Sequence, residues 1–273
     1  MKELLTRALS GTVYVLLLIS SLYFQLGLII LLALFGIISL MEYSKLIKLK
    51  GYIHYLIFII IYAFFWYICL YKADINNSYE AINILLVTSI FVNLILLKDL
   101  FTFKKIPLFE TKRYITTTFY LSSGFVFLLL IANFKNIFTP LLLLGAFILV
   151  WVNDSAAYLV GKNFGKQKLF PSISPKKTVE GFLGGLFFAC IASYFIALYS
   201  ETLNSTSWLI MAIIVSVFGT FGDLIESKFK RQAGVKDSGV IMPGHGGLLD
   251  RLDSLIFAAP FMYLFLSIIN YVS

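Results

Sequence analysis

Charged residues are scarce in this chain. Asp, Glu, Lys and Arg make up 13% of its 273 residues, whereas soluble domains carry roughly 25%. Hydrophobic residues make up 60%, which is more apolar surface than a water-soluble core of this size can hide. Apolar stretches of about 18 or more residues are typical of membrane spans. The scarcity of charge therefore argues against an ordinary soluble domain and predicts an integral membrane protein.

Cysteine is also scarce, because Cys69 and Cys190 are the only two. Both lie in apolar runs far apart in the chain, which excludes a disulfide framework or a zinc-ligand spacing and favours two small hydrophobic residues in the interior. The apolar runs lack an alternation of period two, so a transmembrane β-barrel is disfavoured. There is no repeat of fixed period and no low-complexity linker.

What the sequence does contain is a series of nine apolar runs, which predict an all-α polytopic bundle of about nine transmembrane helices. We expect the first run to be a retained span, because no small-residue cleavage site precedes the next run. The first two runs, with almost nothing polar between them, predict a tight hairpin or a partly re-entrant pair. The nine expected spans are Leu9–Phe24, Leu26–Met41, Tyr52–Tyr71, Ala81–Leu97, Tyr114–Asn133, Phe138–Val152, Val179–Tyr199, Trp208–Phe221 and Leu255–Tyr271.

The basic residues predict the orientation of these spans. If the N-terminus is cytoplasmic, all Lys and Arg except Lys72 and Lys135 fall on the cytoplasmic side. So strong a bias follows the positive-inside rule and predicts that the C-terminus lies outside. The net charge of +8 is thus gathered on one face, next to anionic lipid, and gives no reason to expect nucleic acid as a partner.

We expect a single integral domain over residues 1–273. Residues 1–135 would form N-terminal helices that serve as a scaffold facing the lipid. Residues 136–273 would form a C-terminal half that carries the functional site, because the mixed polar segments lie there.

The first of these segments, 151–181, combines Asp154 with lysines, glycines and the run SPKKTVEG. We expect a helix to begin near Pro175, with Thr178 as its cap and Glu180 in its early turn. Basic and hydroxyl side chains beside the positive end of a helix form a candidate anion site. An ordinary helix cap beside topology-determining lysines explains the same residues, so both interpretations stay open.

The second segment, FGDLIESKFKR at 221–231, places Asp223 and Glu226 three residues apart, on one face of a helix. We expect both acids at the boundary between a span and the cytoplasm, where a carboxylate needs a partner, water or a metal ion. Salt bridges with Lys230 would satisfy them as well as a bound cation would.

In the third segment, LLDRLDS at 248–254, Asp250 and Asp253 are again three residues apart, in the expected first turn of the last helix. Acids there are favourable for the helix dipole alone. Two carboxylates on one face also form an oxygen-rich cation site, and Mg²⁺ typically takes one or two carboxylates and completes its shell with water and phosphate. Carboxylates that hold Mg²⁺, lysines that bind phosphates and a glycine-rich loop together are typical of phosphoryl-group transfer.

The run SKFKRQAGVKDSGVIMPGHGGLLDRLD, residues 227–253, resembles the signature of phosphatidate cytidylyltransferases, also called CDP-diacylglycerol synthases. The run SPKKTVEG at 174–181 resembles a second stretch of the same family. The resemblance is specific over about residues 150–260, and the first 130 residues match only in hydrophobic character.

The resemblance implies an enzyme that joins CTP and phosphatidic acid to give CDP-diacylglycerol and pyrophosphate. It implies a requirement for Mg²⁺, with room for a second cation, and a homodimer in the cell membrane whose active site faces the cytoplasm. Diacyl chains would enter sideways from the bilayer.

Combining the resemblance with the residue patterns gives an expected set of site residues. The expected metal ligands are Asp223, Asp250 and Asp253. The expected catalytic residues are Asp223, Asp250, Lys236 and His245. The expected substrate-binding residues are Ser174, Lys176, Lys177, Lys228, Arg231, Asp237, Gly246, Gly247 and Arg251. The role of Asp154 stays open, and His245 could equally be a loop residue bonded to the backbone.

Two alternatives remain at this stage. A cytidylyltransferase of the same fold could act on another lipid phosphate, such as an ether lipid or an isoprenoid phosphate. In a different class, a cation-coupled transporter would also place acids in membrane helices, but near the bilayer midplane and beside broken helices. A CDP-alcohol phosphotransferase is disfavoured because its DGxxAR run is missing.

Overall fold

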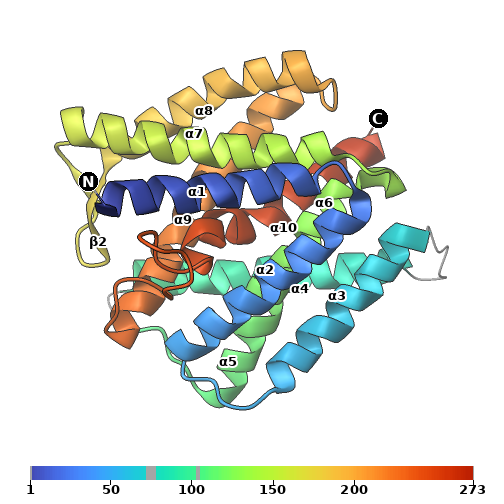
Figure 1. Ribbon diagram of the computed structural model, residues 1–273, viewed down its shortest axis with the longest axis horizontal. Helices are drawn as coiled ribbons and strands as arrows, with labels where there is room; N and C mark the ends of the chain where they lie inside the picture. Colours follow the sequence, from blue (N-terminus) through green and yellow to red (C-terminus); the bar gives the residue numbers. More distant parts are fainter. Residues whose placement is uncertain (1, 72–77, 103–104, 273) are drawn as a thin grey trace.

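A computed structural model describes residues 2–71, 78–102 and 105–272 of the chain. Over these residues the fold is a bundle of long helices with one small β-hairpin (Figure 1). The elements, in chain order, are α1 (Lys2–Ser21), α2 (Gln25–Leu46), α3 (Ile53–Tyr71), α4 (Ser78–Phe101), α5 (Glu110–Thr116), the π-helical segment η1 (Thr117–Ser122), α6 (Ser123–Ala132), the 3-10 turn η2 (Phe134–Asn136), α7 (Pro140–Phe164), β1 (Lys168–Phe170), β2 (Ser174–Thr178), α8 (Val179–Ser200), α9 (Ser205–Ala233) and α10 (Leu249–Val272).

The prediction of an all-α polytopic membrane protein is confirmed. Within the described ranges, seven helical stretches are long and apolar enough to cross a membrane, and two shorter apolar helices cover Leu9–Ser21 and Ile53–Cys69. Each of the nine expected runs overlaps one of these stretches. The fifth expected run corresponds to α5, η1 and α6, which form one continuous helical stretch.

The ends of the expected spans are where the sequence interpretation was wrong. The runs expected to end at Val152 and Phe221 continue as helix to Phe164 and Ala233, because packing against neighbouring helices carries a helix past residues of weak helix propensity such as Asn153 and Asp154. Pro175 lies in β2 instead of a helical turn, since the chain first makes a short antiparallel hairpin in which Lys168 pairs with Thr178. The helix α8 begins at Val179 instead of near Pro175, but Thr178 is its cap as expected, because the Thr178 hydroxyl accepts a hydrogen bond from the Gly181 amide at 3.1 Å.

The core lies around α6, in which every residue is buried. Helix α10 packs against both α6 and α9, and the Phe218 and Phe261 rings stack between α9 and α10 with centroids 3.7 Å apart. Helices α7 and α8, joined by the hairpin, pack against each other as an antiparallel pair. A Cβ atom added at Gly185 would lie 2.8 Å from the carbonyl oxygen of Asn153, so the two helix backbones are in close contact there.

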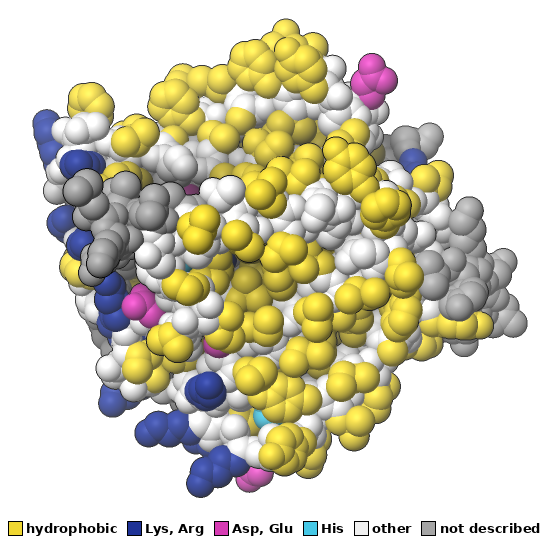
Figure 2. Space-filling model, in the orientation of Figure 1, with side chains coloured by type: hydrophobic (Ala, Val, Ile, Leu, Met, Phe, Trp, Pro, Cys, Tyr) yellow, Lys and Arg dark blue, Asp and Glu magenta, His cyan; other side chains and the backbone are white. Residues whose placement is uncertain are grey.

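The polar residues gather at one end of this bundle. In Figure 1, α7, α9 and α4 end on the left, where α8 and α10 begin and where the hairpin and the glycine-rich loop before α10 also lie. Figure 2 shows Lys and Arg side chains along the left and lower edges of the same face, with hydrophobic side chains over most of the remainder. The fold therefore brings segments from both halves of the sequence to one charged end.

Candidate active site

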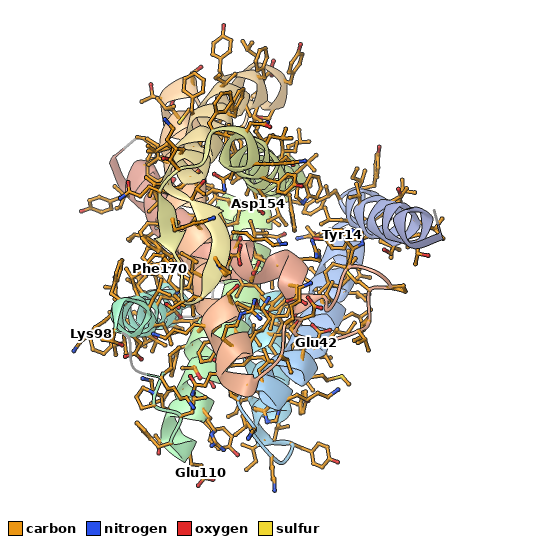
Figure 3. The ribbon with its side chains drawn as sticks, turned by 90° about the vertical axis from the view of Figure 1, so that its left-hand side faces the viewer. Tyr14, Glu42, Lys98, Glu110, Asp154 and Phe170 are labelled. Carbon is orange, nitrogen blue, oxygen red and sulfur yellow. The ribbon has the colours of Figure 1, made fainter. Side chains whose placement is uncertain are left out.

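A cavity of about 790 Å³ opens at this end between α7, the hairpin, α8, α9 and α10. Its wall carries a dense mixture of acidic and basic side chains. The acidic residues are Asp154, Asp223, Asp237, Asp250 and Asp253, and the basic residues are Lys162, Lys168, Lys176, Lys177, Lys230 and Arg251. In Figure 3, which looks onto this end, Asp154 of α7 points toward the interior between α7 and α10. A cavity with convergent charges of both signs suits a charged ligand that binds together with a cation.

Asp223 and Lys177 form an ion pair across the cavity, between α9 and β2. The Ser227 hydroxyl, one helical turn further along α9, donates a hydrogen bond to the other Asp223 oxygen at 3.2 Å. Burial opposes the charge of the Lys177 ammonium, but the Asp223 carboxylate beside it outweighs burial, so the pKa of Lys177 lies above its ordinary value. Lys177 is therefore a permanent cation in the cavity at neutral pH.

The Asp250 carboxylate organises the glycine-rich loop that precedes α10. It accepts hydrogen bonds from the amides of Gly247 at 2.7 Å and Ser238 at 2.9 Å, and from the Ser238 hydroxyl at 3.0 Å. It also forms an ion pair with Lys230 at 2.6 Å. At Gly246, where φ is +88°, a Cβ atom would lie 2.7 Å from an Asp250 oxygen, so only glycine fits both the backbone conformation and the contact.

Two acids near the cavity are more deeply buried, Glu226 behind its wall and Asp253 on it. Glu226 is completely buried and pairs with Lys230, which thereby bridges Glu226 and Asp250. Asp253 is only 6% exposed, and one of its oxygens accepts a hydrogen bond from the Ser254 amide at 2.7 Å. Salt bridges of Lys230 with both Asp223 and Glu226 were expected. The bridge between Lys230 and Glu226 forms, whereas Asp223 pairs with Lys177.

The cavity residues fit a hard divalent cation without forming a closed metal cage. Among the described residues there is no group of three or more His, Cys, Asp or Glu side chains close enough to hold an ion by themselves. Mg²⁺ in phosphoryl-transfer sites is held by one or two carboxylates plus substrate phosphates and water. The cavity-facing oxygens of Asp223, Asp253 and Asp154 provide donors of that kind.

Comparison with known proteins identifies the family. The model of the cytidylyltransferase family matches residues 5–269, which is nearly the whole chain. The chain belongs to the cytidylyltransferase family. Proteins named phosphatidate cytidylyltransferase are among its relatives: one from Staphylococcus aureus (strain COL) is 52% identical over 126 residues, and one from Bacillus subtilis (strain 168) is 48% identical over 126 residues. These alignments cover 45% and 46% of this chain, and the chain spans about half the length of the curated relatives it matches, 48% and 47%.

The fold of this cytidylyltransferase-family chain brings many of the predicted site residues together. The predicted residues on the cavity wall are Lys176, Lys177, Asp223, Asp237, Asp250, Arg251 and Asp253. Gly246 and Gly247 lie directly against Asp250. Asp154, whose role was left open, also lines the cavity.

Other predicted residues lie outside the cavity lining. The Lys228 ammonium donates to the carbonyl oxygens of Asp99 and of Thr102, the latter at 2.7 Å, and so closes the C-terminal end of α4. Arg231 donates to the carbonyl oxygens of Ile173 at 3.3 Å and Val235 at 3.2 Å. Both side chains therefore bond to backbone carbonyls of neighbouring segments, and neither lines the cavity.

The remaining predicted residues, Ser174, Lys236 and His245, are also absent from the wall of this cavity. Ser174 is half-buried at the start of β2, and Lys236 is exposed. The His245 ring lies 2.8 Å from the Ser10 hydroxyl of α1, and its carbonyl oxygen accepts a bond from Arg251 at 2.7 Å. His245 thus links α1 to the loop, and its predicted catalytic role stays a prediction.

Sequence reasoning missed Glu42, which is 2% exposed and comes from α2 in the N-terminal half. Its carboxylate accepts hydrogen bonds from the amides of Leu248 at 3.1 Å and Leu249 at 2.8 Å, where α10 begins. Figure 3 shows Glu42 beside the loop that leads into this helix. The available signal was a single acidic residue directly after the second expected run, because such a residue is costly if the membrane helix continues past it without a partner for the carboxylate.

Proposed function

We propose that this chain is a phosphatidate cytidylyltransferase, which converts CTP and phosphatidic acid to CDP-diacylglycerol and pyrophosphate. The single observation that carries the proposal is the cavity at the charged end of the helices, where Lys177 and Asp223 face each other beside Asp253 and Arg251. The names of the relatives, together with membership of the cytidylyltransferase family, support this choice of reaction.

In the proposed reaction, an oxygen of the lipid phosphate attacks the α-phosphorus of CTP. A new P–O bond joins the lipid phosphate to the cytidylyl group, and the bond to the β-phosphate breaks, so that pyrophosphate leaves with that electron pair. The second pKa of a phosphate monoester is about 6, so the attacking phosphate is already a dianion at neutral pH. The reaction therefore does not require a strong general base from the protein.

The basic residues of the wall would bind the phosphates. Lys177, near the end of β2, is held by its ion pair with Asp223, and Lys176 is its neighbour in the strand. The Arg251 guanidinium, from α10, is held by its hydrogen bond to the His245 carbonyl oxygen. These cations would orient the two phosphates and stabilise the negative charge that builds up during transfer.

The proposed cofactor is Mg²⁺, with room for a second cation, held by Asp223 and Asp253. Bound there, it would neutralise charge on the nucleotide phosphates. We rank Asp250 below these two as a ligand, because two amides, a hydroxyl and Lys230 already occupy its oxygens, whereas among the described residues Asp223 is bound by Lys177 and Ser227 alone.

We further propose that the charged end faces the cytoplasm of a cell membrane, so that the N-terminus is inside and the C-terminus outside. The concentration of Lys and Arg at that end supports this orientation. The proposal that two copies form a homodimer rests on the family resemblance alone. The transporter alternative is less favoured, because the acids line a cavity that also takes in the hairpin and the first turns of α10 at the charged end of the bundle.

The direct test is an assay of the protein purified in detergent with phosphatidic acid, labelled CTP and Mg²⁺. We expect labelled CDP-lipid and pyrophosphate in equal amounts, and loss of both when a chelator removes the metal. An ether-lipid phosphate and an isoprenoid phosphate, tested in parallel, identify the alternative substrates. If no lipid phosphate gives product, the enzymatic proposal is wrong.

A further inference from the structure

The glycine-rich loop before α10 is held by two carboxylates from opposite sides. Asp250 holds it from within α10, as described above. Glu42 holds it from α2, nearly two hundred residues earlier in the chain, through the amides of Leu248 and Leu249 and through the Ser238 hydroxyl at 3.3 Å. The Ser238 hydroxyl lies within hydrogen-bond distance of both carboxylates and shares its single proton between them, so it is the point at which the two anchors meet.

The Glu42 carboxylate also shapes the loop by excluding side chains. A Cβ atom added at Gly239 would collide with one Glu42 oxygen, and a Cβ atom at Gly247 would lie 2.6 Å from the other. The loop backbone therefore lies directly on the carboxylate at two places. These contacts explain why Gly239 and Gly247 are glycines, because any larger residue at either position would collide with the buried Glu42 side chain.

The energetic argument favours a dedicated role for Glu42. A carboxylate that is 2% exposed in a membrane helix is costly unless its charge is compensated. Here the compensation comes from backbone amides at the start of α10, where the helix dipole also favours an anion. The same bonds satisfy amides that a helix start otherwise leaves without intrahelical partners.

We propose that Glu42 is a positioning residue, which fixes the glycine-rich loop and the first turn of α10 so that the cavity is preorganised for nucleotide phosphates. Asp250, Arg251 and Asp253, which line the cavity, all lie in the first turns of α10, directly after the amides that Glu42 binds. The N-terminal half would thus contribute to the site instead of serving only as a scaffold. The link to nucleotide binding rests on the proposed function.

Hydrogen exchange of the full-length protein in detergent tests the anchor without any substrate. In Glu42→Gln, one acceptor oxygen becomes an amino group that faces an N–H or O–H donor, so at least one anchoring bond is lost. We expect amide exchange in residues 238–250 to accelerate about tenfold, as loss of one or two hydrogen bonds allows, while α4 and α8 remain unchanged. The matched control is Glu110→Gln, which removes the same charge at an exposed position of α5 and should change nothing.

Gly239→Ala perturbs the same contact from the loop side and leaves the membrane helix intact. The added methyl group would displace the Glu42 carboxylate, so we expect the same local acceleration. Gly27→Ala is its control, because a Cβ atom there meets its nearest neighbour at an ordinary 3.6 Å. Unchanged exchange in residues 238–250 in either variant, or global unfolding of both, would overturn the positioning role.

Kinetics then separate positioning from a general loss of stability. We expect the KM for CTP to rise about tenfold in Glu42→Gln, with the KM for phosphatidic acid within about twofold of the unsubstituted protein. A purely structural defect would lower the amount of active enzyme and leave both KM values unchanged, which would contradict the inference. If the unsubstituted protein makes no CDP-lipid, the proposed function fails, whereas the exchange experiment still decides whether Glu42 anchors the loop.

Discussion

Among the hairpin residues on the cavity wall, Lys177 is the one with an ion pair to an acid of the cavity. Its ammonium pairs with Asp223 on α9, and both side chains remain about one-third exposed to the cavity, at 29% and 31%. An ion pair that is so accessible contributes little to stability. Its exposure suits an interaction with substrate, because an incoming phosphate can contact the lysine without unfolding anything.

The first prediction is that Lys177→Met lowers kcat/KM about a hundredfold, because a charge aimed at the reacting phosphates is lost while the length of the side chain is kept. Steady-state kinetics with CTP and phosphatidic acid measure this loss. Lys45→Met is the control, since Lys45 is exposed in the last turn of α2 and is not among the residues that line the cavity. A Lys177 variant with activity close to that of the control would remove Lys177 from the site.

The second prediction concerns pH. A lysine whose pKa is raised keeps its charge until the pH passes that pKa, above the ordinary value of about 10.4. The ion pair with Asp223 is therefore fully formed at neutral pH, and its contribution is lost only as the pH rises through the higher value. The lipid phosphate instead loses its second charge below a pH of about 6.

The pH profile of kcat/KM should accordingly be flat between about pH 7 and pH 9 and fall on the acid side of about pH 6. Lys177→Arg should keep the same plateau, because an arginine stays protonated throughout. A descending limb between about pH 7 and pH 9 that disappears in Lys177→Arg would show that the lysine titrates in this range and would contradict the assignment.

At the scale of the elements, the site depends on how closely α7 and α8 approach each other. The amide of Gly181 is bonded to Thr178, and Glu180 accepts hydrogen bonds from the amides of Lys166 and Gln167 at 3.0 and 3.1 Å, so the start of α8 is tied to the end of the α7–β1 connection. Close packing between the helices places Asp154 beside the strand that carries Lys177.

The third prediction tests this close approach. Gly185→Ala would place a methyl group 2.8 Å from both the carbonyl and the amide oxygen of Asn153, so the helices must separate locally. We expect a loss of about 1–3 kcal/mol, as is usual for overpacking, and a lower activity because Asp154 moves with Asn153. Thermal unfolding in detergent measures the first effect, with Gly27→Ala as the control. Unchanged unfolding would show that the helix pair adapts freely.

The elements also show what a sequence can and cannot reveal. Hydrophobic runs predicted the helices, because burial in lipid requires long apolar segments, and the i, i+3 spacing correctly placed Asp250 and Asp253 in the first turns of α10. The run 227–253, which resembles the family signature, correctly indicated the glycine-rich loop before α10 as part of the site. Partners across the bundle were not predictable, because nothing in local spacing pairs Lys177 with Asp223 or brings Glu42 to Leu249. The positive charges of Lys228 and Arg231 suggested phosphate binding, but these side chains donate to the backbone carbonyls of Thr102 and Ile173.

At the scale of the whole molecule, charge and hydrophobicity are separated along the bundle. The cavity, the hairpin and the glycine-rich loop share one end with most of the basic side chains (Figures 1 and 2). The turns between α6 and α7 and between α8 and α9 lie at the other end. Under the proposed function, a nucleotide dissolved in water on one side and a lipid that diffuses within the bilayer would meet at the charged end.

The fourth prediction tests this orientation. In a background without Cys69 and Cys190, Lys45→Cys would place a thiol at the charged end and Lys135→Cys at the opposite end, and both positions are exposed. A membrane-impermeant thiol reagent applied to intact cells should label Lys135→Cys and leave Lys45→Cys unmodified until the membrane is permeabilised, because the basic end stays in the cytoplasm. The reverse pattern would place the cavity outside, away from cytosolic CTP, and would contradict both the orientation and the proposed use of that nucleotide.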